Sequence, residues 1–308
     1  MSNENTNSFR SGFVSLIGEP NAGKSTLLNA LLGEKLSIVT PKPQTTRKKV
    51  LGIYNSEDSQ IVLLDTPGIM SPKYKLHEAM LGIADHARDD SDAILFILDL
   101  DAHLSENKPI VQNLAFKRIH QSGKPIILII NKIDKRSQEE VLVSIGNLSK
   151  EFEFAEIVPL SARSGFNIQE LVKAVRKYLP QNEPLYPTDI LSDAPERFFV
   201  AEIIREKIFK QFSKEIPYSA EVEVESFKEQ FESEGRKELI ECAIIVERDS
   251  QKAILIGEGG AAIKRVGEAA RREIEQFLGR PVFLKLFVKV RKDWRENERM
   301  LKGFGYDS

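Results

Sequence analysis

Residues 13–32, FVSLIGEPNAGKSTLLNALL, join a short apolar run to an amphipathic run through a turn with two glycines. Gly18 to Ser25 fit the P-loop pattern at every fixed position. The glycines let successive backbone N–H groups point at phosphate oxygens, and a following helix adds its N-terminal dipole. Lys24 is expected to reach the β- and γ-phosphates, and the Ser25 hydroxyl to bind Mg²⁺. The stretch therefore predicts a strand, a phosphate-binding loop and a helix that together hold a nucleoside triphosphate.

The composition is that of an ordinary globular protein. Of 308 residues 41% are hydrophobic, and a net charge of -2 excludes a uniformly basic nucleic-acid-binding surface but not a local basic patch. The single cysteine, Cys242, lies in the apolar run 239–246, so no disulfide framework is possible and a reducing cytosol is expected. No apolar run approaches the roughly 20 residues of a membrane span. The Asn- and Ser-rich residues 1–10 are expected to be a flexible tail rather than a signal peptide.

Short apolar runs alternate with amphipathic runs from residue 13 to about residue 179, which predicts a mostly parallel sheet with helices on both faces. The predicted strands are 13–17, 61–64, 93–98, 126–130 and 157–160, and the predicted helices are 24–32, 76–87, 107–121, 138–151 and 168–178. A further run at 51–54 is expected to pair with 61–64 as an antiparallel edge strand. We assign residues 11–180 to this α/β domain.

A proline-rich stretch follows this domain. Four prolines fall within sixteen residues, at positions 180, 184, 187 and 195, so residues 181–196 are predicted to be a linker. Residues 197–308 are predicted to form a smaller α+β domain. Its expected helices are 197–212, 261–277 and 294–301, and its expected strands are 221–227, 239–246, 253–256 and 282–290.

The identity of the base is predicted by residues 131–134, Asn-Lys-Ile-Asp, at the end of the apolar run 126–130. Open α/β sheets bind ligands at this end of their strands. The carboxylate of Asp134 can accept two parallel hydrogen bonds from guanine, one from N1–H and one from the exocyclic amine. Adenine offers neither donor and would leave the carboxylate unpaired. The tetrapeptide therefore favours a guanine nucleotide.

Residues 65–68, Asp-Thr-Pro-Gly, end another apolar run. Asp65 is expected to hold Mg²⁺ through a water, and the Gly68 N–H to meet the γ-phosphate, whose loss would free the loop. An ordinary turn fits the Pro-Gly pair equally well, so the order of the motifs decides between the two interpretations.

Five segments in order resemble the guanine-nucleotide motifs of the translation-factor-related GTPases: 18–25, 44–47, 65–68, 131–134 and 161–162. The resemblance implies that Thr46, rather than Thr45, is the switch threonine that binds Mg²⁺ and covers the γ-phosphate. The implied metal ligands are Ser25, Thr46 and Asp65, and the residues implied to act in hydrolysis are Asn21, Lys24, Thr46, Asp65 and Gly68. The implied nucleotide contacts are Gly18, Glu19, Pro20, Asn21, Ala22, Gly23, Lys24, Ser25, Thr26, Asp65, Thr66, Pro67, Gly68, Ile69, Asn131, Lys132, Ile133, Asp134, Ser161 and Ala162, the last two mainly through backbone.

One departure from the Ras-like enzymes concerns hydrolysis. Ile69 follows Gly68 where those enzymes carry a glutamine that orients the attacking water. Intrinsic hydrolysis is therefore expected to be slow, or to depend on an activator or another electrophile. In related GTPases with Pro-Asn in the P-loop, the asparagine helps to hold a potassium ion, so the resemblance implies that Asn21 does the same. A plain loop-forming role for Asn21 is the alternative.

A G-x-x-G sequence, Gly257-Glu258-Gly259 followed by Gly260, precedes the predicted helix 261–277. Such a loop allows close approach of a nucleic-acid backbone. The expected element order resembles a KH domain of the bacterial type, type II. Residues 252–308 hold 13 Lys and Arg against 8 Asp and Glu, whereas residues 191–251 hold 9 against 15, so basic charge gathers after the loop. The candidate RNA contacts are Gly257, Glu258, Gly259, Gly260, Lys264, Arg265, Arg272, Lys285 and Lys289.

Glu258 departs from the many KH loops that place Lys or Arg between the two glycines. A carboxylate repels phosphate, so RNA affinity is expected to come from backbone N–H groups and from the later basic residues.

A single GTPase domain, a proline-rich linker and a C-terminal KH domain resemble a bacterial family of ribosome-assembly GTPases along the whole chain. The resemblance implies a monomer that binds 16S rRNA near its 3′ end, assists maturation of the small (30S) subunit, and associates peripherally with the inner membrane. It implies GTP or GDP and Mg²⁺ as cofactors, with K⁺ as a further candidate.

Other functions remain to be weighed. The main alternative is an RNA-binding scaffold that nucleotide regulates but that hydrolyses too slowly for turnover to matter. A tRNA-modifying GTPase is disfavoured because the only cysteine lies in a predicted strand, and a tandem-domain GTPase because no second P-loop follows residue 180.

Overall fold

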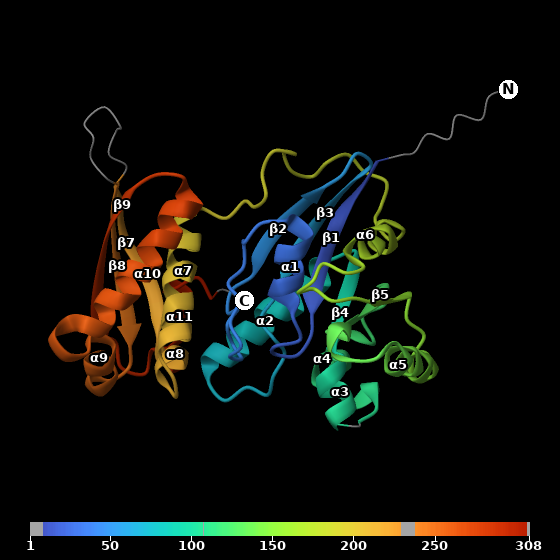
Figure 1. Ribbon diagram of the computed structural model, residues 1–308, viewed down its shortest axis with the longest axis horizontal. Helices are drawn as coiled ribbons and strands as arrows, with labels where there is room; N and C mark the ends of the chain where they lie inside the picture. The colour runs from blue at the N-terminus through green and yellow to red at the C-terminus, as the bar shows by residue number, and fades with distance from the viewer. Residues whose placement is uncertain (1–8, 107, 229–237, 307–308) are drawn as a thin grey trace.

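Two β-sheets organise the chain (Figure 1). Separate clusters of buried hydrophobic residues pack against them. The computed structural model describes residues 9–106, 108–228 and 238–306. Most of the tail expected at 1–10 thus lies outside the described residues, and its last residue, Arg10, begins the first strand.

The first sheet has six strands in the order β2-β3-β1-β4-β5-β6. These are β1 (Arg10–Ile17), β2 (Val50–Asn55), β3 (Ser59–Asp65), β4 (Ala93–Asp99), β5 (Ile126–Asn131) and β6 (Glu156–Pro159). Only the β2–β3 pair is antiparallel among these strands, and β2 lies at the edge. The prediction of a mostly parallel sheet with an antiparallel edge strand is therefore confirmed.

Helices cover both faces of this sheet, as predicted. They are α1 (Lys24–Leu32), α2 (Lys75–Asp90), α3 (Leu100–Glu106), α4 (Leu114–Ile119), α5 (Gln138–Glu151) and α6 (Ile168–Arg176), with short 3₁₀ turns η1 (Ile110–Gln112) and η2 (Ile133–Lys135). Leu27 of α1 and Leu171 of α6 belong to one core cluster, and Phe116 of α4 and Leu148 of α5 to another. Both faces of the strands are buried for this reason, and their sequences are continuous apolar runs.

The single helix predicted at 107–121 is wrong. The structure has α3 before this segment, and η1 and α4 within it; residue 107 lies outside the described residues. Asn113 has extended backbone angles (φ -63°, ψ 129°), and its side chain accepts hydrogen bonds from the N–H groups of Ala115 and Phe116. Asn113 therefore caps a new helix, which apolar periodicity alone does not reveal.

The second sheet has three strands, β7 (Glu221–Lys228), β8 (Glu238–Val246) and β9 (Val282–Val290), with β7 antiparallel and β9 parallel to β8. The helices are α7 (Glu196–Gln211), α8 (Ile216–Ser219), α9 (Asp249–Ile256), α10 (Ala261–Leu278) and α11 (Glu298–Gly303), with 3₁₀ turns η4 (Glu258–Gly260) and η5 (Trp294–Glu296). One core cluster joins α7, α10 and one face of the sheet, and Cys242 is buried in it.

Two predictions for this part are wrong. Residues 253–256, expected to be a strand, are the last turn of α9, so the G-x-x-G loop connects two helices. Gln251, in the first turn of this helix, fixes the start of the helix, since its Oε1 accepts hydrogen bonds from the N–H groups of Glu247 (2.9 Å) and Arg248 (3.0 Å). The helix expected at 294–301 is divided into η5 and α11 by Asn297, whose side chain caps α11.

The two parts are in contact. Leu76, Met80 and Ile83 of α2 form one buried cluster with Ala243 and Ile245 of β8 and with the C-terminal segment, on the sheet face opposite α7 and α10. The linker expected at 181–196 runs along the first sheet, where its Leu191 carbonyl accepts a hydrogen bond from Ile53 N–H (2.8 Å). Across the described ranges, no helix is both long and apolar enough to cross a membrane.

Candidate nucleotide-binding site

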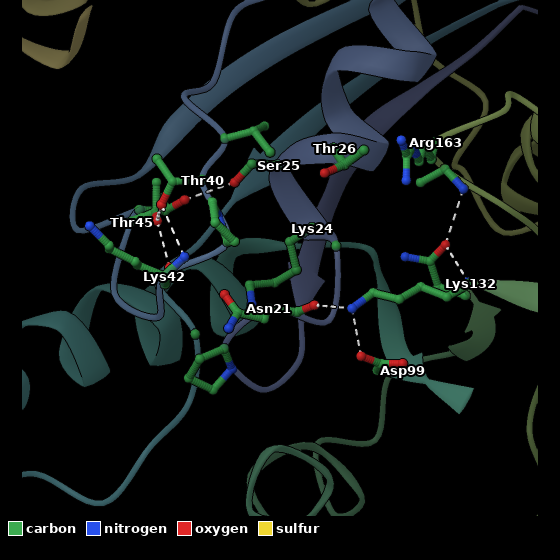
Figure 2. A pocket seen from close by; sticks show the side chains of 18 of the residues that line it. Asn21, Lys24, Ser25, Thr26, Thr40, Lys42, Thr45, Asp99, Lys132 and Arg163 are labelled. Atoms are coloured by element: carbon green, nitrogen blue, oxygen red, sulfur yellow. Dashed lines mark hydrogen bonds and ion pairs between the residues drawn. The ribbon is translucent and has the colours of Figure 1, made fainter. Parts of the chain in front are cut away.

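The five predicted motifs meet at the carboxyl ends of β1, β3, β5 and β6 and beside the segment before β2, around a cavity of about 690 Å³ (Figure 2). Twelve residues predicted to bind nucleotide or metal line it: Pro20, Asn21, Gly23, Lys24, Ser25, Thr26, Thr46, Gly68, Asn131, Lys132, Asp134 and Ala162. The other predicted contacts lie outside the lining: Gly18, Glu19, Ala22, Asp65, Thr66, Pro67, Ile69, Ile133 and Ser161.

Sequence reasoning missed part of this lining. The missed residues are Ile38, Val39, Thr40, Pro41, Lys42, Asp99, Lys135 and Arg163, whereas Gln44 and Thr45 also line the cavity and belong to the predicted motif 44–47. Most belong to the segment 33–49 between α1 and β2, which we call switch I. A connection of this length without regular structure is uncommon in a compact domain and is itself a signal of function. Arg163 directly follows the motif at 161–162.

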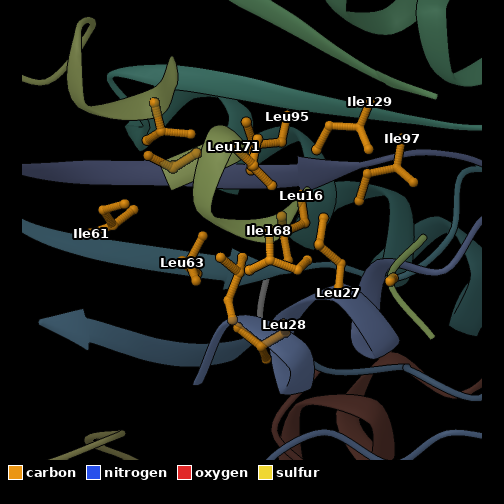
Figure 3. Close-up of a cluster of buried hydrophobic side chains, with 14 of the residues drawn as sticks. Leu16, Leu27, Leu28, Ile61, Leu63, Leu95, Ile97, Ile129, Ile168 and Leu171 are labelled. Carbon is orange, nitrogen blue, oxygen red and sulfur yellow. The ribbon is translucent and has the colours of Figure 1, made fainter. Parts of the chain in front are cut away.

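The P-loop is held rigidly between the core and the base motif. Figure 3 shows Leu16 of β1 and Leu27 and Leu28 of α1 packed in one core, which fixes the strand and helix on either side of the loop. Gly23 has φ 103°, and a Cβ there would lie 2.2 Å from Asn131 Nδ2. A Cβ on Gly18 would lie 2.5 Å from the Ile97 carbonyl oxygen. Close contacts therefore require glycine at both positions, and at Gly23 the positive φ requires it as well.

Lys24 is buried and satisfies its ammonium group within the loop. Nζ donates to the carbonyl oxygens of Gly18 (3.0 Å) and Glu19 (2.9 Å). Burial lowers the pKa of Lys24 to about 8, while the nearby Asp65 and Glu19 carboxylates act in the opposite direction. A desolvated ammonium group beside a ring of backbone amides is a strong site for phosphate oxygens.

Ser25, Thr46 and Asp65 come together at one end of the cavity. Ser25 Oγ lies 2.7 Å from Thr46 Oγ1 and donates to Asp65 Oδ2 at 2.7 Å. Two ligands of one octahedral Mg²⁺ lie about 2.9 Å apart, so the hydroxyl spacing suits the ion. Asp65 Oδ1 is buried with no hydrogen-bond partner in the described part of the chain, and burial raises the pKa of Asp65. The oxygen donors, the spacing and the unpaired oxygen therefore fit Mg²⁺ with its water.

The segment 65–68 lies against the P-loop. A Cβ on Gly68 would lie 2.8 Å from Pro20 Cα, so only glycine at this position allows the two backbone segments to lie so close together. The Ile69 N–H donates to the Gly18 carbonyl at 3.1 Å, while its side chain is buried in the core. Ile69 thus brings no polar group to the cavity, in agreement with the expectation that it cannot orient water.

Asn131 joins the base motif to the P-loop. Its Nδ2 donates to the Ala22 carbonyl (2.8 Å), and its Oδ1 accepts from the N–H groups of Ala162 (3.0 Å) and Lys132 (2.8 Å). Lys132 Nζ bridges Asp99 Oδ2 (2.6 Å) and the Asn21 carbonyl (2.8 Å). Asp134 is exposed in η2 at the rim of the cavity, where its carboxylate can accept hydrogen bonds from a base.

Switch I also contacts the second part of the chain. Arg47, fully buried, donates from Nη1 to the Ala220 carbonyl (2.8 Å) and from Nη2 to the carbonyls of Pro217 (3.0 Å) and Tyr218 (2.9 Å). Lys42 Nζ donates to the carbonyls at the end of α7. The segment that contributes Thr46 to the cavity is therefore attached to the second sheet and its helices.

The G-x-x-G loop lies apart from this cavity. Gly257, Gly259 and Gly260 have φ of 72°, 55° and 79°, and Glu258 and Gly259 are exposed. Lys264 and Arg265 are exposed in the first turns of α10, and Arg272 is exposed farther along the same helix.

Lys285 and Lys289 lie on β9, away from the G-x-x-G loop. Their neighbours on β9 pack against α7 and α10, so these two side chains project from the opposite sheet face, where they pair with Glu241 (3.1 Å) and Glu225. The structure thus does not bring them to the loop.

Two protein-family models match the chain. One, described as a 50S ribosome-binding GTPase, matches residues 13–132, and one, described as a KH domain, matches residues 215–295. The chain is 49% identical to GTPase Era of Geobacter metallireducens, over 97% of this chain and 99% of that protein. It is 42% identical to GTPase Era of Clostridium kluyveri, over 96% of this chain and 99% of that one.

Two solved structures are similar over the same extent. One is an Era variant from Aquifex aeolicus bound to GDP and AlF4⁻. The other is Era in complex with MgGDPNP and nucleotides 1506–1542 of 16S ribosomal RNA. Each is 43% identical to this chain with a TM-score of 0.90, and the match covers 97% of this chain and 100% of the other.

Proposed function

The chain belongs to the Era family of GTPases, and we propose that its KH domain binds 16S rRNA near its 3′ end while its GTPase domain alternates between GTP and GDP. The observation that supports this most directly is the likeness, along nearly the whole chain, to an Era bound to both a GTP analogue and that RNA. As in the family, the chain is a GTP hydrolase, which makes the scaffold without turnover the weaker alternative. We place the GTPase domain at 11–180, the linker at 181–196 and the KH domain at 197–308.

We assign the steps of the reaction to the residues that the cavity brings together. Backbone N–H groups of residues 18–25 bind the phosphates, Lys24 leaves its carbonyl partners for phosphate oxygens, and Asp134 selects guanine. Ser25, Thr46 and Asp65 hold Mg²⁺, which neutralises charge on the β- and γ-phosphates. Ile69 leaves the attacking water without a side-chain partner, so this chain relies on another group to orient that water.

Potassium is the group that we propose near the γ-phosphate. Asn21 is exposed, has φ 64° and lines the cavity, so its side-chain oxygen is available to a cation. GTP hydrolysis by the full chain is expected to be faster in KCl than in NaCl at equal ionic strength, and Asn21→Ala is expected to remove the difference. Asn147→Ala, an exposed asparagine of α5, is the matched control. Equal rates in the two salts would rule the proposal out.

RNA binding gives the direct test of the KH assignment. The chain loaded with a GTP analogue is expected to bind RNA of the sequence 1506–1542 in preference to a scrambled RNA of the same composition. Glu258→Lys is expected to raise the affinity severalfold and to steepen the dependence of log K on log salt by about one, because one more phosphate is neutralised. Glu139→Lys, at an exposed position of α5, makes the same charge change away from the loop. Equal affinity for the two RNAs would contradict the proposal.

The larger assembly follows from the family resemblance. We propose that the chain acts as a monomer on the 30S subunit and that it associates peripherally with the inner face of the cell membrane. The exposed basic residues Lys264, Arg265 and Arg272 on α10 are our candidates for RNA phosphate contacts beside the loop. Lys285 and Lys289 are candidates only for RNA that also reaches the opposite sheet face.

A further inference from the structure

Asn29 of α1 holds the beginning of switch I to the GTPase core. Its Oδ1 accepts hydrogen bonds from the N–H groups of Leu36 (3.0 Å) and Ser37 (2.8 Å), and its Nδ2 donates to the Ser37 carbonyl (2.7 Å). Both polar atoms of the side chain are therefore used to fix one short piece of backbone. None of these three bonds involves a residue of the nucleotide cavity.

Ser37 connects the beginning of switch I to the proposed metal site. Its side chain is buried, and Oγ donates to Asp65 Oδ2 at 3.0 Å. Ser25 donates to the same oxygen at 2.7 Å. Two donors on Oδ2 fix the rotation of the carboxylate, and they leave Oδ1, the buried oxygen without a partner in the described residues, as the one available to the ion or its water.

We propose that Ser37 is a positioning residue for the Mg²⁺ site, which aligns the Asp65 carboxylate independently of the γ-phosphate. This rests on the proposed binding of Mg²⁺ with the guanine nucleotide. Ser37 does not touch the nucleotide cavity; it acts through Asp65.

On this proposal the start of switch I stays at the metal site in both nucleotide states, whereas the Thr46 hydroxyl leaves that site when the γ-phosphate is lost. Ser37 is attached to α1 through Asn29, whereas the side-chain hydrogen bond that joins Thr46 to the site, within the described residues, is the one between its hydroxyl and Ser25 Oγ. Loss of the γ-phosphate removes an interaction that holds Thr46 at the site. The hydrogen bonds of Asn29 and Ser37 do not involve the phosphate, so we expect them to persist. The Ser37 contact therefore supports Mg²⁺ in the GDP state as well as in the GTP state, and it slows the release of GDP.

The test measures release of a fluorescent GDP from the full chain over a range of Mg²⁺ concentrations. Mg²⁺ is expected to slow the release of GDP, and the readout is the Mg²⁺ concentration at which half of this decrease in release rate is reached. Loss of an outer partner of a metal ligand lowers metal affinity about 10–100-fold, so Ser37→Ala is expected to raise this concentration at least about tenfold. The same shift is expected with a non-hydrolysable GTP analogue. Ser37→Thr keeps the hydroxyl and is expected to stay within about twofold of the natural protein.

Ser144→Ala is the matched control, because Ser144 is also buried in the GTPase domain but donates to the Glu140 carbonyl in α5. The inference is overturned if Ser37→Ala matches Ser144→Ala, or if Ser37→Thr shifts as far as Ser37→Ala. If Ser37→Ala does not fold, Ser37→Cys, whose thiol is a weak donor of similar shape, must show the shift or the inference fails. If the unsubstituted protein releases GDP at the same rate at every Mg²⁺ concentration, the proposed Mg²⁺ site itself fails, which is a separate outcome.

Discussion

Asp134→Asn is expected to weaken GTP binding at least about 100-fold and to create binding of xanthosine triphosphate. A hydrogen bond to a charged group contributes about 1.5–3 kcal/mol, and the substitution removes both charge-assisted bonds and sets the asparagine NH2 against the guanine amine, so we expect a cost of about 3 kcal/mol or more. Xanthine carries an oxygen where guanine carries the exocyclic amine. The asparagine amide can donate to that oxygen and accept from N1–H, which restores both bonds.

The measurement is a titration of each variant with fluorescent GTP, XTP and ATP in excess Mg²⁺. Glu139→Gln is the matched control, because it removes one exposed carboxylate five residues away and conserves side-chain shape. GTP affinity of Asp134→Asn that stays close to the Glu139→Gln value would contradict the assignment of Asp134 to the base. An unchanged P-loop predicts that affinity for inorganic phosphate or pyrophosphate is the same in both variants.

Arg47→Ala is expected to lower the free energy of unfolding by about 3 kcal/mol. Removing one partner of a buried ion pair typically costs about 3–5 kcal/mol, and Arg47 lies 3.4 Å from the buried Glu221. We expect the lower end of that range because Lys48 (2.9 Å) and Tyr306 (2.7 Å) still hydrogen bond to Glu221. The carbonyl oxygens at the end of α8 lose their donors as well.

The same substitution is expected to weaken communication between the domains. Thr46 and Arg47 are adjacent, so we expect a movement of Thr46 on loss of the γ-phosphate to pull on the contacts of the Arg47 guanidinium group with the KH domain. The ratio of RNA affinities in the GTP-analogue and GDP states is expected to approach one in Arg47→Ala. The measurements are denaturant unfolding and RNA titration in both states. Lys49→Ala, an exposed cation of the same segment, is the control, and an Arg47→Ala ratio equal to that of Lys49→Ala would contradict this coupling.

The site could be predicted to a large extent because its chemistry is local in sequence. Each motif follows a strand, and strands of a parallel sheet bring their carboxyl ends to one edge, so segments 18–25, 65–68 and 131–134 had to meet once the alternation was recognised. The role of Ser37 had no such signal. A serine in a long loop shows nothing of its partner until the loop is placed beside α1 and β3.

The wrong predictions have a common cause. A four-residue apolar run such as 253–256 fits a buried helix turn as well as a strand, and the difference lies in Gln251, which caps the helix from within. The prediction of a single helix at 107–121 was wrong because the side chain of Asn113 caps a new helix within this segment. Lys285 and Lys289 are a different case: they share one face of β9 as predicted, the packing of α7 and α10 decides which sheet face that is, and their contact with RNA stays a prediction.

The sequence by itself determined the α/β architecture, the order of the nucleotide motifs, the preference for guanine and the presence of a KH-type loop, because period, glycine placement and a short motif encode these directly. Only the tertiary structure decided that switch I is attached to α1 at Ser37 and to the KH domain at Arg47. These contacts join residues far apart in the chain, through carbonyl oxygens and carboxylates that every sequence offers in abundance. Their pairing depends on which surfaces the packed core brings within hydrogen-bond distance, and that information is not local.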